Sequence, residues 1–187
     1  MIDTMSFSLL STKLHIPHPR SNFVSRQRLV QKLLGSVEQT HSFVLISGPA
    51  GFGKTTLLSE FVAVLQKPVA WVSLDAGDND PIQFWTYLIY AIQSIRPDIG
   101  QAALAILQSP QAFASEIIPT LLINDLSKSP DALVLILDDY HVVQHSSIHE
   151  AMAFILDHLP ENLYLLVSTR TDPPLAFDPV TRPKSAG

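Results

Sequence analysis

The stretch Gly48-Pro49-Ala50-Gly51-Phe52-Gly53-Lys54-Thr55 decides the fold of this chain. It matches the pattern G-x-x-x-x-G-K-[ST] at every position, and the glycines of that pattern let the backbone bend around a phosphate group. A mostly apolar run at 42–47 predicts a buried strand before it, and residues 55–62 predict a helix after it. Consecutive backbone N–H groups and the amino end of that helix would then point at an anion. The alternative, an ordinary glycine turn beside a surface lysine, fits this context less well.

Two side chains of this phosphate loop carry specific chemistry. Lys54 would reach the β- and γ-phosphates of a nucleotide, and the hydroxyl of Thr55 would bind Mg²⁺. The other residues would surround the phosphates with backbone N–H groups. The residues that we expect to contact the nucleotide are Gly48, Pro49, Ala50, Gly51, Gly53, Lys54, Thr55 and Thr56. The loop therefore predicts binding of ATP or ADP together with Mg²⁺.

Composition narrows the class of protein. With 187 residues, 47% apolar and 16% charged, the chain suits one globular domain with room for a small appendage. It has no cysteine, which excludes disulfides and thiolate metal sites. Residues 1–5 show no basic region ahead of an apolar run, so we expect no secretory signal, and the longest apolar run, 132–137, is too short to cross a bilayer. We therefore expect a cytoplasmic protein without a membrane partner, and the net charge of −5 argues against an extended nucleic-acid surface.

Apolar strands alternate with helices along the chain. The strands are apolar throughout rather than at every second residue, which is typical of a parallel sheet covered on both faces. Asp80, Pro81 and Gln83 predict a helix start with Asp80 as the N-cap. Strands are expected at 42–47, 69–74, 133–137 and 163–168, and helices at 26–37, 55–66, from 81, at 147–158, and in pieces over 97–128 with breaks at Pro110 and Pro119. The sequence thus predicts an α/β domain at 26–175, preceded by an extended lead-in at 1–25, with ligands at the carboxyl ends of the strands.

The third expected strand ends in the acid pair Asp138-Asp139. Acids directly after five apolar residues are costly to bury unless a positive group meets them. In a phosphate-loop protein that group is Mg²⁺, held by the loop hydroxyl, here Thr55, and by an acid on a neighbouring strand. We assign Asp138 to Mg²⁺, through water, and Asp139 to orienting or deprotonating the attacking water. A helix cap or an exposed turn is the alternative for either acid.

The fourth expected strand ends in Ser168-Thr169-Arg170. If this strand lies beside the first, Arg170 would sit next to the phosphate loop. It could then sense or stabilise the γ-phosphate. A salt bridge or a solvated arginine is the alternative.

A histidine-based metal site is a further, weaker alternative. His141, His145 and His149 recur at every fourth residue, and Asp139 and His158 could add ligands. The spacing is helical only if the helix begins early, because His141 lies in the loop after the acid pair. Neither a guanine-reading Asn-Lys-x-Asp motif nor a second glycine-rich dinucleotide pattern is present.

Further motifs accompany the phosphate loop at characteristic spacings. They are Leu10-Ser11-Thr12-Lys13-Leu14, Val24-Ser25-Arg26-Gln27-Arg28-Leu29, Trp71-Val72-Ser73-Leu74-Asp75, Asp78-Asn79-Asp80-Pro81, Leu135-Ile136-Leu137-Asp138-Asp139-Tyr140-His141, Asp157-His158-Leu159-Pro160 and Ser168-Thr169-Arg170. Over residues 9–175 these motifs closely resemble the MalT-like, LuxR-type large ATP-binding transcriptional regulators. Those regulators belong to the signal-transduction ATPases with numerous domains.

This resemblance implies a fold and a set of roles. The fold would be the P-loop NTPase three-layer sandwich with a mainly parallel sheet of about four strands. The activity would be an ATP/ADP switch with slow hydrolysis, which drives self-association. By motif match, Asp138 is the magnesium acid, Asp139 the hydrolytic acid and Arg170 the sensor. Arg26 falls in a short motif that borders the nucleotide in such ATPases.

The resemblance ends near residue 175. The family continues into a fifth strand, a winged helix, a helical sensor and a DNA-reading helix-turn-helix, whereas 176–187 resembles a tail after a truncation. We therefore expect no direct DNA binding by this chain and an open sheet edge at Phe43–Ser47 that favours self-association, unless Phe7–Leu14 folds over it. Two other functions stay open: a non-enzymatic remnant that only binds nucleotide or associates, and a stand-alone transferase or kinase.

Overall fold

The computed structural model describes residues 9–18, 24–38, 43–109 and 117–175. Their centre is a sheet of four strands, β1 (Phe43–Ser47), β2 (Val69–Ser73), β3 (Leu133–Asp138) and β4 (Leu163–Thr169). All pairings are parallel, and the strand order is β1-β4-β3-β2. The carboxyl ends of all four strands therefore meet along one edge of the sheet, as the sequence predicted for an α/β fold.

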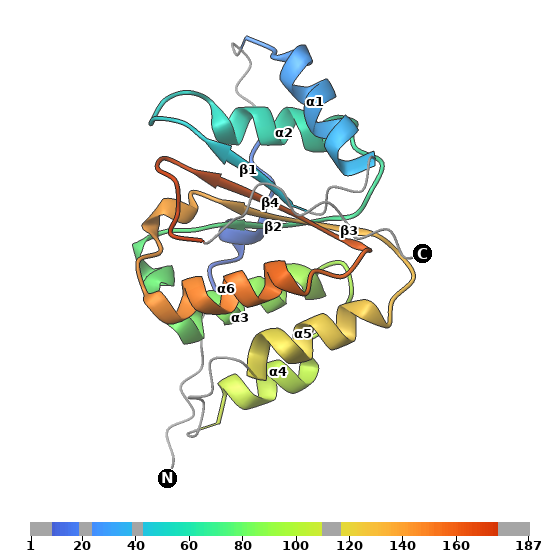
Figure 1. Ribbon diagram of the computed structural model, residues 1–187, viewed down its shortest axis with the longest axis vertical. Coiled ribbons are helices and arrows are strands. Elements are labelled where there is room, and N and C mark those ends of the chain that lie inside the picture. Colours follow the sequence, from blue (N-terminus) through green and yellow to red (C-terminus); the bar gives the residue numbers. More distant parts are fainter. Residues whose placement is uncertain (1–8, 19–23, 39–42, 110–116, 176–187) are drawn as a thin grey trace.

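Helices cover both faces of this sheet (Figure 1). α1 (Gln27–Glu38) and α2 (Lys54–Val64) lie on one face. On the other side lie α3 (Pro81–Gln93), α4 (Gln101–Leu107), α5 (Ile117–Ser127) and α6 (Ser146–Asp157). The expected three-layer arrangement is confirmed.

The central strand β3 explains why these strands are apolar throughout. Val134 and Ile136 pack in the core under α1 and α2, and Leu135 and Leu137 pack in the core under α3 to α6. All six residues of β3 are buried. A strand with a helix layer on each face has no side turned to water, so alternation of polar residues disappears.

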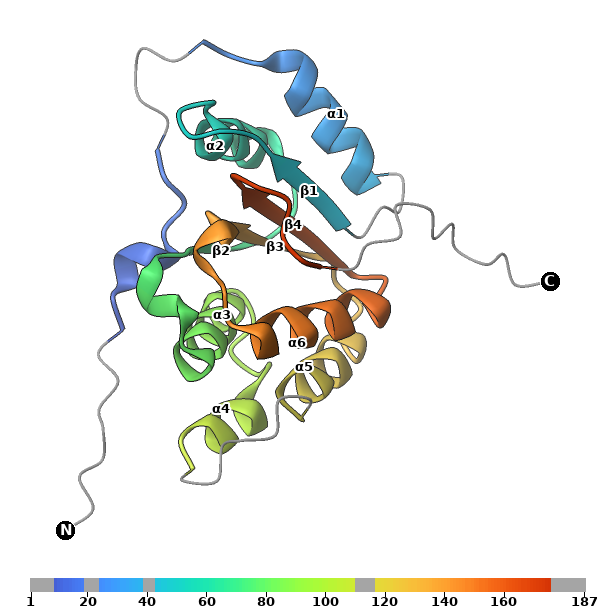
Figure 2. The same ribbon diagram turned by 60° about the vertical axis from the view of Figure 1, so that its left-hand side comes forward.

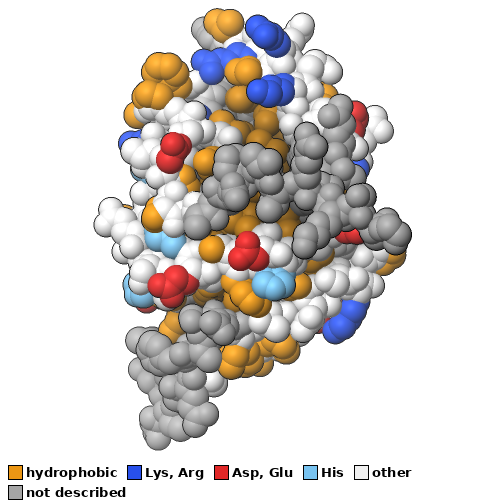
Figure 3. All heavy atoms as spheres, in the orientation of Figure 1, with side chains coloured by type: hydrophobic (Ala, Val, Ile, Leu, Met, Phe, Trp, Pro, Cys, Tyr) orange, Lys and Arg blue, Asp and Glu red, His pale blue; other side chains and the backbone are white. Residues whose placement is uncertain are grey.

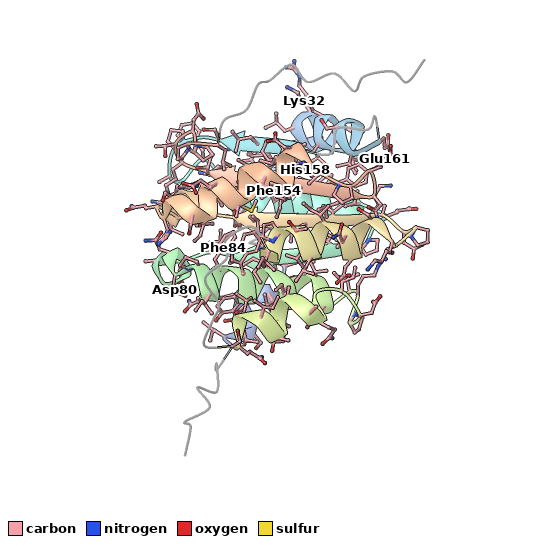
Figure 4. The ribbon with its side chains drawn as sticks, turned by 60° about the horizontal axis from the view of Figure 1, so that its bottom comes forward. Lys32, Asp80, Phe84, Phe154, His158 and Glu161 are labelled. Carbon is pink, nitrogen blue, oxygen red and sulfur yellow. The ribbon has the colours of Figure 1, made fainter. Side chains whose placement is uncertain are left out.

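Local signals set the helix α3 as expected. The Asp80 carboxylate accepts the backbone N–H of Gln83 at 2.9 Å, and Pro81 is the first helical residue. Figure 4 shows Asp80 at the start of α3 and Phe84 one turn further along the same helix. The Phe84 and Trp85 rings pack edge to face with centroids 5.2 Å apart. The cap thus begins the helix at the point where its apolar face reaches the core.

One expected helix break is wrong. Pro119 is the third residue of α5 and does not interrupt it. A proline is tolerated in the first turn of a helix, because the N–H that it lacks would have no partner inside the helix. Pro110 lies outside the described residues.

Part of the expected lead-in at 1–25 is helical rather than extended, within the described residues 9–18. Its residues Ser11–Leu14 form the 3₁₀ helix η1, which contacts β2 and α3 (Figure 2). Lys13 is only 6% exposed and pairs with Asp75 and Asp78 in the loop after β2. This segment therefore lies at the β2 side of the sheet, and the described residues 9–14 do not cover the β1 edge.

β1 is an edge strand of the described sheet, as expected. Within the described ranges the sheet pairs β1 with β4 alone, and no described strand lies on its other side. The expected tail at 176–187 falls outside the described residues. Among the helices that are described, none combines the length and apolar character needed to cross a membrane.

Candidate nucleotide-binding site

The phosphate loop connects β1 to α2 at the carboxyl edge of the sheet. Its first residue, Gly48, donates its backbone N–H to the carbonyl oxygen of Thr169 at 3.2 Å, which ties the loop to β4. Gly51 and Gly53 have φ angles of 79° and 72°, in the left-handed region that glycine adopts readily. Gly53 also caps α2, so the free N–H groups of an 11-residue helix begin directly after it. The loop has the backbone conformation that its glycines predicted.

Lys54 lies folded over the loop. Its ammonium donates to the carbonyl oxygens of Gly48 at 2.6 Å and Pro49 at 3.1 Å. The positive charge therefore sits inside the bend of the backbone rather than out in solvent. A phosphate group entering the loop would meet this charge together with the helix N-terminus.

The side chains of Asp138, at the end of β3, and Thr55, at the start of α2, contact each other. The Thr55 hydroxyl donates to Asp138 Oδ2 at 2.7 Å, although the residues are 83 positions apart in sequence. The Ser168 hydroxyl donates to Asp138 Oδ1, and the backbone N–H of Asp139 lies 3.2 Å from the same oxygen. The parallel register causes this meeting, because the carboxyl ends of β1, β4 and β3 lie side by side.

The environment of Asp138 makes it an unusual carboxylate. It is 3% exposed, and burial is the main cause that raises its pKa, with the nearby charge of Asp139 adding to the rise. The hydrogen bonds from Ser168 and Thr55 act in the opposite direction without cancelling the effect. Its hydrogen-bond donors are neutral, and no ion pair joins it to a described residue. A buried carboxylate surrounded by hydroxyl oxygens is a donor set that suits Mg²⁺.

Asp139 faces a different environment from its neighbour. Its backbone is left-handed, with φ 59°, the sole positive φ at a non-glycine residue in the described chain. Its N–H donates to Ser168 Oγ at 3.0 Å, whereas its side chain is 40% exposed. One carboxylate oxygen lies 3.6 Å from Nδ1 of His141, within ion-pair range but too far for a hydrogen bond. The two adjacent acids thus present one buried carboxylate and one that water can reach.

Arg170 follows β4, which is the immediate neighbour of β1. The condition under which we expected it beside the phosphate loop is therefore met. Arg170 is exposed and makes no ion pair with any residue that the structure describes. Burial lowers the pKa of His141, and the positive charges of Arg170 and Lys54 lower it further, while Asp139 opposes them. Arg170, Lys54 and Asp139 are thus close enough to act on one imidazole.

Arg26 also lies close to the phosphate loop. A Cβ atom built on Gly53 would lie 3.6 Å from the guanidinium Nη2 of Arg26. The backbone N–H of Arg26 donates to the Glu60 carboxylate at 3.3 Å, which fixes the start of α1 against α2. Thr56 lies in the first turn of α2. Arg26 and Thr56 thus lie beside the phosphate loop and in the first helical turn after it.

The histidines do not form a metal site. His149 Nδ1 lies 3.0 Å from the Tyr140 hydroxyl in the core, and burial lowers the pKa of His149. His145 caps α6 by accepting the N–H of Ser147. Figure 4 shows His158 next to Phe154 on α6, where the ring centroids are 4.4 Å apart. The described residues contain no group of three or more His, Asp or Glu side chains that could hold a metal ion.

On the face in Figure 3, Lys and Arg side chains gather over α1, which carries the exposed Arg28 and Lys32. The described part of this face shows no continuous basic band across the sheet layers.

Sequence reasoning missed three residues of this region. Ser168 holds both the carboxylate of Asp138 and the amide of Asp139, and it is fully buried. Its signal was the hydroxyl pair Ser168-Thr169 directly after an apolar strand, where buried polar groups need partners. Lys13 and Asn79 contact the loops at the same edge of the sheet, and nothing local in the sequence indicates those contacts.

A comparison with protein-family models matches residues 22–168 to the AAA ATPase domain. The chain belongs to the AAA ATPase domain family. The match includes Arg26, the phosphate loop and the acid pair, and it ends at Ser168, two residues before Arg170.

Curated relatives resemble this AAA ATPase domain over most of its length. The HTH-type transcriptional regulator MalT of Yersinia enterocolitica is 41% identical over 169 residues, and MalT of Klebsiella pneumoniae is 39% identical over the same length. Each alignment covers 90% of this chain and 18% of the relative. The resemblance expected from the sequence is confirmed, and the chain spans about a fifth of the length of these relatives.

Solved structures support the fold of the AAA ATPase domain. The Walker-type ATPase PABY2304 of Pyrococcus abyssi gives a TM-score of 0.55 at 15% identity, covering 83% of this chain and 48% of that one. Cdc6p of Pyrobaculum aerophilum gives 0.52 at 14% identity, covering 88% and 44%. At such identities the likeness shows the shared fold alone.

Proposed function

We propose that this chain binds Mg²⁺-ATP or ADP through Gly48–Thr56 and serves as the nucleotide switch module of a MalT-like transcription regulator. The observation that carries this is the 2.7 Å contact between the Thr55 hydroxyl and the Asp138 carboxylate, beside an ammonium held inside the phosphate loop. A hydroxyl at the start of a helix and an acid at the end of another strand are the two groups that hold Mg²⁺ in phosphate-loop proteins.

Thr55 and Asp138 would hold the metal, and Lys54 would hold the phosphates. The fit is supported by Asp138 itself, which is buried among neutral donors and has a raised pKa. When bound, Mg²⁺ would supply positive charge that neutralises the phosphate oxygens. Ser168 keeps the Asp138 carboxylate oriented in the meantime by donating to its second oxygen. Arg26, over Gly53, borders the place where the rest of the nucleotide would lie.

Asp139 and Arg170 are the groups that we propose for hydrolysis. Asp139 has a carboxylate that water reaches, and its backbone is fixed by Ser168. It can therefore accept a hydrogen bond from a water molecule and orient it. Arg170 is exposed next to the phosphate loop, and its positive charge suits the oxygens of a γ-phosphate. We propose slow turnover, because the relatives are regulators and a switch must persist in its ATP state.

The setting of this module follows from its relatives. We propose that DNA reading and inducer sensing reside elsewhere in a regulator of this kind, so the nucleotide domain at 26–175 does not bind DNA directly. A regulator of transcription acts where the genome is, which in a bacterium is the cytoplasm. The edge strand β1 is the surface that we propose for self-association.

Isothermal calorimetry with ATP and ADP, with and without Mg²⁺, tests nucleotide binding. Lys54→Ala removes the ammonium held inside the loop and should weaken ATP binding tenfold or more, about 1.4 kcal/mol or above. Lys32→Ala, at an exposed lysine of α1 (Figure 4), is the matched control and should bind like the unmodified chain. Equal ATP affinities for Lys54→Ala and the unmodified chain would refute the proposal.

Hydrolysis needs a separate test, because a non-enzymatic nucleotide-binding module would pass the first one. Asp139→Asn should keep nucleotide affinity and lose turnover, since the amide cannot take a proton from water. If Asp139→Asn hydrolyses ATP as fast as the unmodified chain, the assignment of Asp139 is wrong. If the unmodified chain binds ATP and never hydrolyses it, the non-enzymatic alternative holds.

A further inference from the structure

The loop that carries Asp139 is held at its far end by a side chain from the loop that follows β2. Asn79 Oδ1 accepts the backbone N–H of Gln144 at 2.7 Å and of His145 at 2.8 Å. Asn79 ends the short 3₁₀ helix η2 (Ala76–Asn79) that follows β2. One amide oxygen therefore joins the loop after β2 to the loop after β3, using both of its lone pairs.

The segment 139–145 is thereby fixed at both ends. At its start, Asp139 lies next to Asp138 and donates its N–H to Ser168. In the middle, Tyr140–Val142 form the 3₁₀ helix η3, and the Tyr140 ring is fully buried. At its end, His145 caps α6 and donates to Asn79. Since Asp139 has a left-handed backbone, the direction of its side chain depends on where the chain beyond it is held.

Asn79 is fixed in turn by a buried ion pair. Its neighbour Asp78 is fully buried and pairs with the ammonium of Lys13 from the N-terminal segment. Asp78 also accepts the backbone N–H of Asp75 at 2.8 Å and the side-chain amide of Gln83 at 3.2 Å. With these contacts the η2 turn has little freedom, so Asn79 presents its oxygen at a defined position.

We propose that Asn79 is a positioning residue for ATP hydrolysis, which holds the loop 139–145 so that Asp139 faces the phosphate loop. Lys13 acts behind it by fixing η2, so the segment Leu9–Leu14 is part of the catalytic scaffold rather than a leader to the domain. This inference rests on the proposed ATPase function. It adds a role for the β2 side of the sheet, which does not contact the phosphate loop directly.

The test is Asn79→Ala, with Asn79→Asp as the matched control. Asn79→Ala removes the acceptor of both N–H groups, and because Asn79 is only partly buried, we expect the variant to fold. Asn79→Asp keeps oxygens that accept both N–H groups. Single-turnover hydrolysis of radiolabelled ATP gives the rate, calorimetry gives the affinity, and thermal unfolding gives the stability of each variant.

We expect Asn79→Ala to lower the rate about tenfold, because a misplacement of about 1 Å can cost on the order of 100-fold. Its ATP affinity should stay within about twofold, about 0.4 kcal/mol, since no phosphate contact is lost. Asn79→Asp should recover most of the rate.

A rate for Asn79→Ala equal to that of the unmodified chain would overturn this inference alone, as would a failure of Asn79→Asp to recover it. A parallel loss of affinity and stability would show a merely structural role and also overturn it. Absence of any hydrolysis by the unmodified chain would instead overturn the proposed ATPase function, and this inference with it.

Discussion

Lys13→Met should destabilise the protein more than removal of the charge of an exposed lysine does. The Lys13 side chain is 7% exposed, and its ammonium pairs with the fully buried Asp78 and, at 3.1 Å, with Asp75. It also lies 4.3 Å from the centre of the Tyr87 ring. Methionine keeps most of the apolar stem and removes the charge, so the variant isolates the electrostatic part of the interaction.

The magnitude follows from the burial of Asp78. Breaking a buried pair by removing one partner costs about 3–5 kcal/mol, because the remaining charge is left without a counter-ion. Asp78 would still accept N–H groups from Asp75 and Gln83, so we expect the lower end, about 3 kcal/mol. The pair with Asp75, which is 61% exposed, should add only about 0.5 kcal/mol. Total stabilities of domains are about 5–15 kcal/mol, so this loss is large but compatible with folding.

Urea unfolding followed by circular dichroism measures the effect. With an m-value of about 2 kcal/mol/M, a loss of 3 kcal/mol lowers the unfolding midpoint by about 1.5 M. Lys128→Met is the control, since Lys128 is 76% exposed in its pair with Asp125 and should lose less than about 0.5 kcal/mol. The double variant Lys13→Met, Asp78→Asn should recover part of the loss, because no unpaired charge stays buried. If Lys13→Met is no less stable than Lys128→Met, the reasoning about the buried pair is wrong.

Three further outcomes can be checked. Burial raises the pKa of Asp138, so the stability that its protonated form contributes is present below the unfolded pKa near 3.8 and is lost as pH rises through the folded pKa. In thermal unfolding, the stability of Asp138→Asn relative to the unmodified chain should therefore increase from pH 4 toward neutral. A relative stability that decreases over that range would contradict this. In β1, amides of Val44–Ser47 that face away from β4 should exchange quickly with deuterium in dilute samples and slowly in concentrated, self-associated ones, whereas slow exchange of all four amides in a dilute monomer would exclude the open edge. A gel-shift titration of this chain at physiological salt should give no sequence-dependent complex, and a nanomolar one would overturn the absence of direct DNA binding.

The phosphate loop and the fold class could be predicted because their causes are local. Gly51 and Gly53 need positive φ wherever the chain bends around a phosphate, and the uniform apolar runs of β3 and β4 require cover on both faces. The cap at Asp80 likewise depends on residues within one helical turn. Pro119 shows the limit of such reasoning, because whether a proline breaks a helix depends on where the helix begins.

The candidate site also contains residues that the sequence predicted and residues that only the structure identified. From the sequence we could name Asp138 and Arg170 as polar groups at strand ends and Thr55 as the hydroxyl of the phosphate loop, because parallel strands bring their carboxyl ends to one edge. Which strands are neighbours was a condition that the sequence left open, and the order β1-β4-β3-β2 decided it. Ser168 became a functional candidate only when that order placed its hydroxyl between Asp138 and the amide of Asp139.

By itself, then, the sequence determined the elements, the phosphate loop and the acid pair, since each depends on side-chain periodicity or on backbone freedom within a few residues. The tertiary structure alone decided that Thr55 meets Asp138, that Asn79 holds the loop beyond Asp139, and that Lys13 buries its charge beside Asp78 at the β2 side of the sheet. The physical reason is that a local pattern shows which residues must be buried or bonded but does not select the partner. Partners across 65 or 83 positions are selected by the packing of the whole domain.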